Sequence, residues 1–199
     1  MILWSLLCVT VLVLLAVAGH MGTHFYIKNY GLSLKPSKDI SAHKVTHYLQ
    51  SDPAWASDKL GDSQSSMGGT GCLVSVLASV LNDLGVDTDP GRLNAALSEA
   101  QGFINGNVLW SKLHELFPAI DYKSQRIFTS GTLEKALQKD LLPIVKVKYL
   151  GGGVSHWLLV VGAAEGEFLV VDPLDKDQEL MPLSRHGKIF AYRVLVPVE

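Results

Sequence analysis

Hydrophobic residues recur at helical spacing in one stretch near the middle of the chain. Between Gly71 and Gly85, apolar side chains stand three or four positions apart, as they do on one face of an α-helix. These side chains are Leu73, Val76, Leu77, Val80, Leu81 and Leu84. The pattern predicts a helix that begins at Thr70 or Gly71 and ends at Gly85, because glycine tolerates the left-handed geometry common after a helix.

Three further segments show the same helical period. The first is opened by Thr88-Asp89-Pro90, with proline in the first turn, where its missing N–H costs nothing. The other two extend over residues 107–117 and 132–139. The residues on their apolar faces are Leu93, Ala96 and Leu97, then Leu109, Trp110, Leu113 and Leu116, then Leu133, Ala136 and Leu137. The first half of the chain is therefore predicted to be helical.

The C-terminal third changes to the pattern of β-strands, with runs rich in β-branched and aromatic residues. The predicted strands are 143–149, 156–162, 167–172 and 189–196. A short connection joins the two middle strands into a hairpin, and the three glycines 151–153 form a flexible loop before it. Helices first and an antiparallel sheet afterwards predict an α+β fold.

Residues 2–19 form an uncharged apolar segment, ILWSLLCVTVLVLLAVAG. At about 1.5 Å per residue, a helix of this length just crosses a hydrocarbon layer about 30 Å thick. The segment also fits a secretory signal, because Ala16-Val17-Ala18 has the form of a cleavage site before Gly19. No Lys or Arg precedes it, and the first downstream cation is Lys28, so charge fixes no orientation. A single-pass membrane anchor and a secreted protein with a cleaved signal both stay open.

Composition predicts one globular domain behind this segment. Of the 199 residues, 48% are apolar and 18% are charged, which argues against extended disorder. Residues 20–44 are polar and glycine-containing, so they are expected to form a linker between the signal or anchor at 1–19 and a domain at 45–199. The net charge is -2, and the cations are scattered. This charge pattern argues against a nucleic-acid partner.

The two cysteines lie far apart, with Cys8 inside the apolar segment and Cys72 at the start of the predicted helix. If that segment is embedded or removed, neither a disulfide framework nor a zinc cluster can form around Cys72. His20 and His24 are four positions apart but have no third ligand nearby, so no metal or cofactor is expected. A lone cysteine before an apolar helix is commonly a small packed residue. Whether Cys72 is also a nucleophile depends on the residues that lie near it in space.

The predicted hairpin brings a histidine and an aspartate together. His156 and Asp172 are symmetric about Ala164, so pairing about that centre makes them cross-strand neighbours, with Cβ atoms about 4.5–5.5 Å apart. An odd-numbered loop with Gly166 at positive φ keeps this register. A helix N-terminus and a nearby imidazolium both favour a thiolate, and a carboxylate orients the imidazole. Cys72, His156 and Asp172 therefore fit the three roles of a Cys-His-Asp protease site.

Several segments together resemble the C39-like cysteine peptidases, which have a papain-like fold. They are Gln50-Ser51-Asp52-Pro53-Ala54-Trp55, Met67-Gly68-Gly69-Thr70-Gly71-Cys72, Leu84-Gly85, Asp89-Pro90 and the later His156…Asp172-Pro173 hairpin. The resemblance covers roughly residues 47–196. It implies an α+β domain of papain-like type, with N-terminal helices packed on a C-terminal antiparallel sheet.

The same resemblance implies a role for each site residue. Cys72 would be the nucleophile, His156 the general base and acid, and Asp172 the orienting carboxylate. Gln50 would donate its side-chain amide to the oxyanion, together with the backbone N–H of Cys72. Gln64, eight residues before Cys72, is the alternative amide donor. The sequence around Gln50 favours Gln50, because Asp52-Pro53 and Trp55 follow it as in the family pattern.

The leading hypothesis is a thiol hydrolase that cleaves peptide or amide bonds through a thioester acyl-enzyme. Its substrate would be a peptide, a protein or a cell-wall amide, and its other partner would be the membrane, through residues 2–19, unless that segment is cleaved. Two other classes stay open. One is a catalytically inactive papain-like domain that binds peptides at the membrane or cell surface. The other is a structural membrane-surface protein, which predicts that Cys72 is buried and that His156 and Asp172 lie apart.

Overall fold

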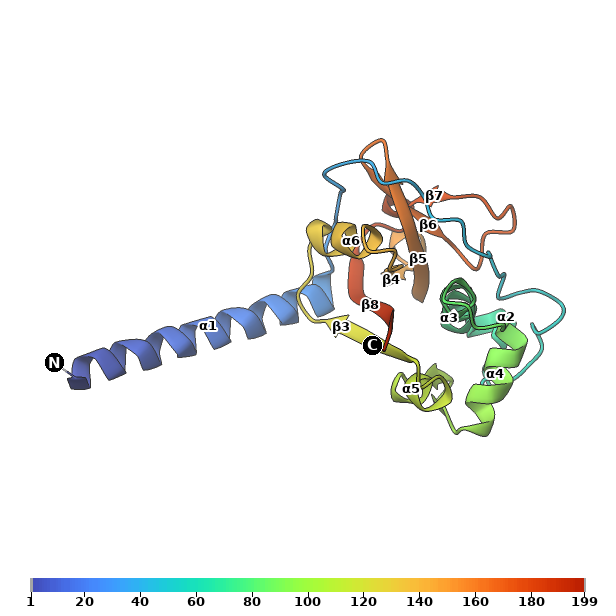
Figure 1. The fold of residues 1–199 in the computed structure, drawn as a ribbon, viewed down its shortest axis with the longest axis horizontal. Coiled ribbons are helices and arrows are strands. Elements are labelled where there is room, and N and C mark those ends of the chain that lie inside the picture. Colours follow the sequence, from blue (N-terminus) through green and yellow to red (C-terminus); the bar gives the residue numbers. More distant parts are fainter. Residues whose placement is uncertain (1, 199) are drawn as a thin grey trace.

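An antiparallel sheet of six strands forms the C-terminal part of the structure, a computed structural model that describes residues 2–198 (Figure 1). The strand order is β3-β8-β4-β5-β6-β7. The strands are β3 (Ile120–Gln125), β4 (Ile144–Lys148), β5 (Ser155–Ala164), β6 (Glu167–Val171), β7 (Met181–Pro182) and β8 (Ile189–Pro197). The four predicted strands correspond to β4, β5, β6 and β8, and the predicted α+β class is confirmed. β3 escaped prediction because, with five of its six residues partly or fully exposed, it lacks an apolar face.

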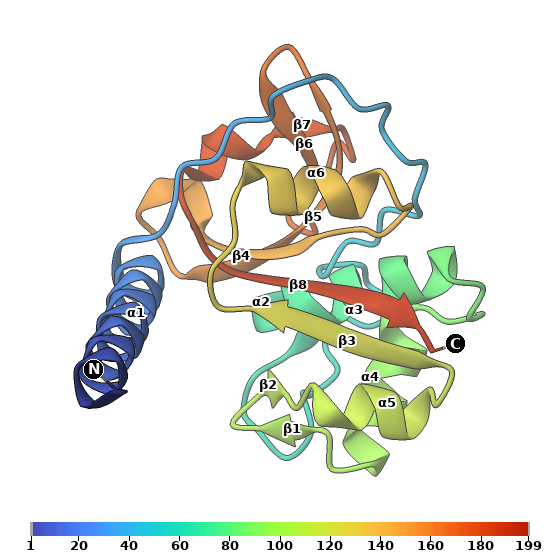
Figure 2. The same cartoon turned by 60° about the vertical axis from the view of Figure 1, so that its left-hand side comes forward.

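The helices gather mainly on one side of the molecule. Figure 2 shows α2, α3, α4 and α5 together with the small β1–β2 sheet, while α6 lies apart from them against the larger sheet. The elements are α2 (Met67–Thr70), α3 (Cys72–Asp83), α4 (Pro90–Glu99), β1 (Phe103–Ile104), β2 (Asn107–Val108), α5 (Ser111–Leu116) and α6 (Ser130–Leu137). This layering leaves the start of α3 facing the sheet.

α3 is the central helix of the core. Every residue from Cys72 to Leu81 is buried, and the helix packs against β5. Gly71 immediately before it is the N-cap. A Cβ at Gly71 would lie 2.5 Å from the Met67 carbonyl oxygen, so only glycine fits between α2 and α3. This tight junction sets the position of Cys72.

The predicted helix over residues 107–117 is shorter in the structure. Residues Asn107 and Val108 belong to β2, and α5 begins only at Ser111. The reason is the turn Asn105-Gly106, where both residues have positive φ and join β1 to β2. Asn-Gly is the strongest short hairpin signal, and here it outweighs the helical spacing of the apolar residues that follow.

Residues 20–44 differ from the free linker that the sequence predicts. The first helix, α1 (Ile2–Tyr30), continues well beyond residue 19, and the side chain of Ile27 is only 2% exposed. Leu32 then pairs with β8, and Ile40 pairs with β5. These apolar side chains contact the core. The part of the segment from Ile27 onward is therefore packed on the domain, while the residues before it belong to the exposed part of α1.

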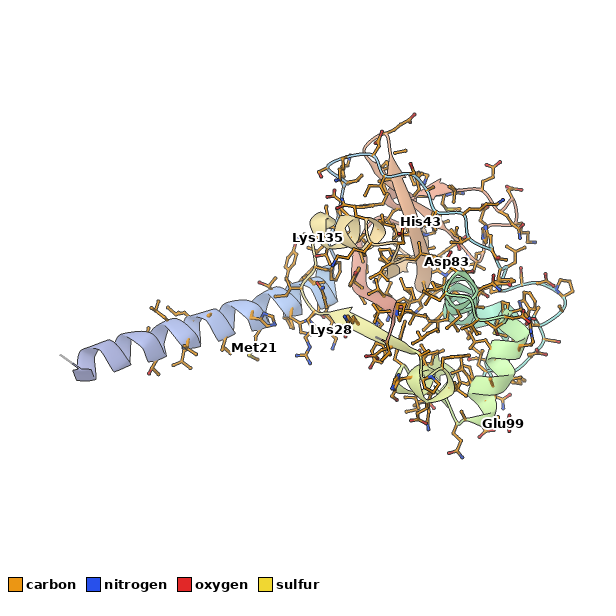
Figure 3. All side chains as sticks on the ribbon, viewed as in Figure 1. Met21, Lys28, His43, Asp83, Glu99 and Lys135 are labelled. Atoms are coloured by element: carbon orange, nitrogen blue, oxygen red, sulfur yellow. The ribbon has the colours of Figure 1, made fainter. Side chains whose placement is uncertain are left out.

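α1 extends away from the rest of the chain. Figure 3 shows Met21 on the part of the helix that stands clear of the domain and Lys28 near the point where the helix meets it. Residues Thr10–Tyr30 form, by length and composition, a helix able to cross a membrane, and it is the one such helix found in the described chain. Apart from Ile27, its large apolar side chains, including Leu12, Leu14 and Leu15, are exposed.

The turn of the β5–β6 hairpin lies later in the chain than predicted. Ala164 pairs with Glu167, so the turn consists of Glu165 and Gly166. Both have positive φ, 54° and 75°, as two-residue hairpin turns require. The predicted centre at Ala164 is therefore wrong.

A bulge in β5 decides which face the site residues share. The pairing shifts by one residue at Val161. Continued toward the start of β5, the new register places Asp172 opposite Leu158, whose side chain is on the same face as that of His156. His156 and Asp172 are thus diagonal neighbours instead of the predicted direct pair. Without the bulge, they would lie on opposite faces of the sheet.

Candidate active site

Cys72 is the first residue of α3 and is 7% exposed. The first N–H groups of a helix have no partner within it, and they create a positive end that favours a negative charge. The preceding turn is closed by backbone hydrogen bonds from Thr70 to Ser66 and from Gly71 to Met67. The thiol is therefore held at a rigid junction where an anion is stabilised.

The sheet brings His156 and Asp172 into direct contact. His156 Nε2 lies 2.6 Å from Asp172 Oδ1, and both residues are 2% exposed. The backbone N–H of Leu174 donates to the same carboxylate oxygen at 2.8 Å. Because Nε2 of His156 is engaged by the carboxylate, Nδ1 is the ring nitrogen left for another partner. The contact contradicts the separation of these two residues that the structural-protein hypothesis predicts, although Cys72 is buried as that hypothesis expects.

The electrostatics of this pair follow from burial and hydrogen bonding. Burial alone would lower the pKa of His156, but its hydrogen bond with Asp172 and its interaction with nearby Cys72 raise it to about 9. Burial would raise the pKa of Asp172, yet its contacts with His156 and His186 hold that pKa well below its usual range. Cys72 thus acts on the imidazole together with Asp172, and all three predicted residues meet in one site.

Gln50 is buried beside the α2–α3 junction. Its Nε2 donates to the Gly68 carbonyl at 2.9 Å, while its Oε1 is buried without a hydrogen-bond partner. A neighbouring bond fixes the segment, because the backbone N–H of Gln50 donates to the Pro173 carbonyl at 3.0 Å. The side-chain amide has two N–H groups, so one is left after the bond to Gly68. Gln64, the alternative, is exposed.

His186 is a site residue that the sequence did not indicate. It ends a short 3₁₀ helix, η2 (Leu183–His186), and its Nε2 lies 3.3 Å from Asp172 Oδ2. Its Nδ1 accepts the backbone N–H of Leu150 at 3.3 Å. This bond places the proton of a neutral ring on Nε2, facing the carboxylate. No spacing along the sequence connects His186 with the other site residues.

His47 also contacts the site, from the segment that carries Gln50. His47 Nε2 lies 2.6 Å from the backbone carbonyl oxygen of Asp172. This bond and the one from Gln50 to Pro173 join the two segments side by side. These two contacts therefore position both Asp172 and Gln50. Neither contact is detectable from spacing, since the two segments are more than a hundred residues apart.

A cavity of about 300 Å³ adjoins the start of α3. The helical side contributes Thr70, Leu73 and Val74, and the sheet contributes Lys146, Trp157 and Arg193. Trp157 directly follows His156 in β5. The cavity therefore lies between the helices and the sheet, at the start of the helix that carries Cys72, although Cys72 and His156 are not among the residues that line it.

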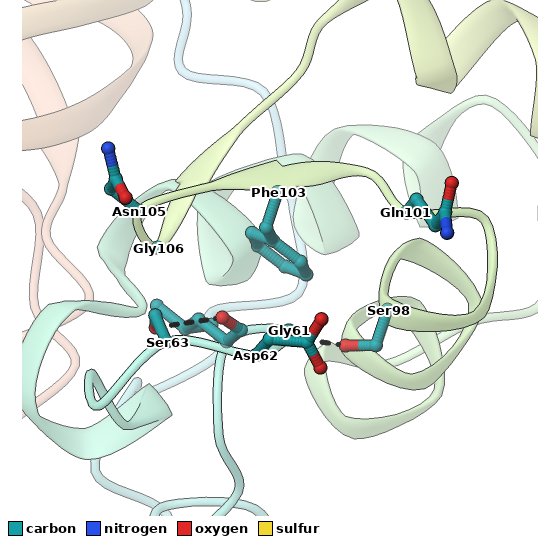
Figure 4. Close-up of a pocket in the computed structure, with 9 residues that line it drawn as sticks. Gly61, Asp62, Ser63, Ser98, Gln101, Phe103, Asn105 and Gly106 are labelled. Atoms are coloured by element: carbon teal, nitrogen blue, oxygen red, sulfur yellow. Dashed lines mark hydrogen bonds between the residues drawn. The ribbon is translucent and has the colours of Figure 1, made fainter.

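A separate cavity of about 250 Å³ lies beside the β1–β2 hairpin (Figure 4). Figure 4 shows Phe103 between the Gly61–Ser63 turn and Gln101, and the Gly61 N–H donates to Ser98 Oγ at 3.3 Å. None of the predicted site residues lines it. The described residues contain no group of three or more His, Cys, Asp or Glu side chains placed to hold a metal ion.

No protein-family profile matches the chain, and no curated protein matches its sequence. Solved structures do match. One is a protein from Bacillus anthracis assigned as a C39-like peptidase, with a TM-score of 0.55 and 11% identity over 82% of this chain and 100% of the other. The chain has the C39-like peptidase fold.

A second match is the peptidase domain of Streptococcus ComA, described as a bifunctional ABC transporter involved in a quorum-sensing pathway. The TM-score is 0.46 and the identity 19%, over 70% of this chain and 98% of the other. At these identities the likeness concerns the fold. The chemistry of this chain therefore depends on its own residues and not on the shared fold.

Proposed function

We propose that this chain is a cysteine peptidase or amidase that works through Cys72, His156 and Asp172. The observation that carries the proposal is the 2.6 Å contact between His156 Nε2 and Asp172 Oδ1. Cys72 also contributes to the raised pKa of the His156 ring. A buried carboxylate, an imidazole and a thiol at a helix N-terminus are the parts that thiol hydrolysis needs. The C39-like fold agrees with this chemistry.

The first half of the reaction forms a thioester. The proton of the Cys72 thiol passes to His156 Nδ1, and Sγ attacks the substrate carbonyl carbon. The carbonyl oxygen becomes an oxyanion, which the Cys72 backbone N–H and the remaining amide N–H of Gln50 stabilise. His156 then gives its proton to the leaving amine as the C–N bond breaks. Asp172 keeps the imidazole oriented and stabilises its positive charge.

The second half of the reaction restores the enzyme. A water molecule gives a proton to His156 Nδ1 and attacks the thioester carbon, and the oxyanion forms again in the same place. The carbon–sulfur bond breaks, a carboxylic acid leaves, and the proton returns to Sγ. Each group is used twice, so the site needs no second acid or base.

An electrophilic thiol probe tests the proposal most directly. Wild-type chain should be labelled at Cys72 and should hydrolyse members of a peptide library, and Cys72→Ala should lose both properties. Cys8→Ala is the matched control, because it removes the other thiol and should leave both unchanged. Hydrolysis that survives in Cys72→Ala would exclude this mechanism.

A peptide-binding domain without catalysis is the second candidate. It is favoured by the low exposure of Cys72, at 7%, and by the bond that already engages Gln50 with Gly68. In that case wild-type chain would retain peptides without cleaving them, and His156→Ala would leave the retention intact. Under the hydrolase proposal, His156→Ala accumulates bound, uncleaved peptide that the wild type turns over.

We infer further that α1 anchors the domain at a membrane surface. The exposed apolar side chains of Thr10–Tyr30 have no cover from the rest of the described chain, and a bilayer would supply it. Lys28 lies at the end of the helix that meets the domain, where a cation can reach lipid headgroups. The substrate would then be one that reaches a membrane-facing cleft.

A further inference from the structure

Arg193 packs against two tryptophans, Trp110 and Trp157, which also contact each other with ring centroids 5.9 Å apart. Its guanidinium carbon lies 4.6 Å from the ring centroid of Trp110 and 5.3 Å from that of Trp157. Such contacts engage a flat face of the guanidinium and leave its N–H edge available. The two rings therefore fix the direction of the cation without neutralising it.

No carboxylate of the described residues forms an ion pair with Arg193 or with its neighbour Lys146. The Nε of Arg193 is buried and has no hydrogen-bond partner. Burial also lowers the pKa of Arg193, which reflects the loss of water around the charge. A desolvated, unpaired cation is unfavourable, so its presence indicates a missing anionic partner.

The cation lies in a cavity at the start of α3, the helix whose first residue is Cys72. Arg193, Lys146 and Trp157 line this cavity of about 300 Å³ together with Thr70 and Leu73, the neighbours of that helix start. Arg193, Lys146 and Trp157 also line a second cavity of about 450 Å³, which extends to Lys28 at the end of α1. Neither lining includes an aspartate or glutamate. The two cavities thus share one wall, and its charge is positive.

We propose that Arg193 and Lys146 form a carboxylate-binding subsite that selects substrates with an acidic group. Guanidinium and carboxylate are matched in shape and form paired hydrogen bonds, which a neutral amide of the same size cannot replace. The claim that this subsite serves cleavage depends on the proposed function, whereas the binding of a carboxylate does not. The carboxylate comes either from an Asp or Glu side chain or from the C-terminus of a peptide.

Peptide capture by full-length Cys72→Ala protein in detergent tests the subsite without turnover. Two random octapeptide libraries with acetylated N-termini are used, one amidated at the C-terminus and one with a free C-terminal acid. A side-chain source predicts at least about tenfold enrichment of Asp and Glu over Asn and Gln in the amidated library, about the discrimination that one charge-assisted pair supplies. A terminal source predicts similar excess capture of the free-acid library.

Variants of the same protein identify the residues responsible. Adding Arg193→Met should abolish either preference, Lys146→Met should reduce it, and Arg193→Lys should retain only part, because lysine is a point charge. Lys123→Met is the matched control, since Lys123 is an exposed cation of β3 outside both cavities. Thermal melting of each variant checks that it is folded.

The outcomes separate this proposal from the proposed function. If Asp and Glu are not enriched and the free-acid library is not captured in excess, the subsite is overturned and Arg193 is left as a packing residue. A preference that survives Arg193→Met overturns it as well. If captured acidic peptides are not hydrolysed by the wild-type chain, the subsite stands and the hydrolase proposal fails. If the wild type hydrolyses acidic and neutral peptides equally well, the hydrolase proposal stands and a role of the subsite in cleavage fails.

Discussion

Gly162 lies against Ala42 so closely that a Cβ at position 162 would stand 2.7 Å from the Ala42 Cα. The contact occurs at the β5 bulge, where the backbone N–H of His43 donates to the Val161 carbonyl at 2.8 Å. The segment after α1 is therefore packed on the irregularity that puts His156 and Asp172 on one face. A contact remote from the thiol thus supports the geometry of the site.

Gly162→Ala should consequently affect both stability and activity. The added methyl group meets backbone atoms, which cannot move aside as a flexible side chain can, so the free energy of unfolding should fall by about 1–3 kcal/mol. Displacement of the bulge should also lower kcat. Chemical denaturation and peptide hydrolysis measure the two effects.

The matched control for Gly162 is Gly152→Ala. A Cβ at Gly152 would have no heavy atom within 4 Å, so this change should alter the unfolding free energy by less than about 0.5 kcal/mol. Equal stability of the two variants would mean that the 40–43 segment yields easily. The bulge would then not depend on this packing.

The raised pKa of His156 predicts an alkaline limit to activity. The leaving amine needs a proton from the imidazolium, so kcat/KM should fall as pH rises through about 9. In Asp172→Asn, the carboxylate that favours the charged ring is gone, and this limit should move to lower pH. The rate at neutral pH should fall by about 10²–10⁴-fold, because the ring also loses its orientation.

Stability should depend on pH in the same direction. His156 is more basic in the folded state than at its ordinary value of 6.5, so its contribution to the unfolding free energy is complete below about 6.5 and is lost toward pH 9. Urea denaturation across this range measures the slope, and His156→Gln should remove it. A wild-type slope that His156→Gln leaves intact would place the titrating group elsewhere.

Much of the site is visible in the sequence because its chemistry is local. Cys72 follows a glycine and is the first residue of a strongly periodic helix. His156 and Asp172 belong to one hairpin and lie only 16 residues apart in the sequence. The bulge at Val161 was not predictable, because it depends on a crossing segment far away in the chain. Two errors, in turn centre and in register, still left both residues on one face.

Other parts of the site depend on contacts that no sequence period encodes. His186 reaches Asp172 from a single 3₁₀ turn, and a period needs several turns to become visible. Arg193 contacts Trp110, which precedes α5, and Trp157, which lies in β5. Only the packing of the helices on the sheet brings these two tryptophans together. The burial of Ile27 was not predictable from composition either, because it results from the contact between the end of α1 and the domain.

His186 should act as a positioning residue for Asp172. Because His186 Nε2 faces Oδ2 while His156 engages Oδ1, His186→Ala should let the carboxylate turn and should lower kcat about tenfold, with little change in KM. A merely structural role would lower the melting temperature without moving the alkaline limit. We expect that limit to shift to lower pH. Ser184→Ala, at an exposed position of the same 3₁₀ helix, should change neither.

α1 should hold the chain in the membrane. Expressed with its full N-terminus, the protein should remain in the membrane fraction after washing at alkaline pH, with a mass that includes residues 2–19. Replacing Leu12 and Leu15 by arginine should release it, because each cation at the centre of a span costs about 2.5–3.5 kcal/mol. The same pair of arginines at the exposed Ser33 and Ser41 should have no effect. A mature chain that starts at Gly19 and is recovered in solution would instead identify the segment as a cleaved signal.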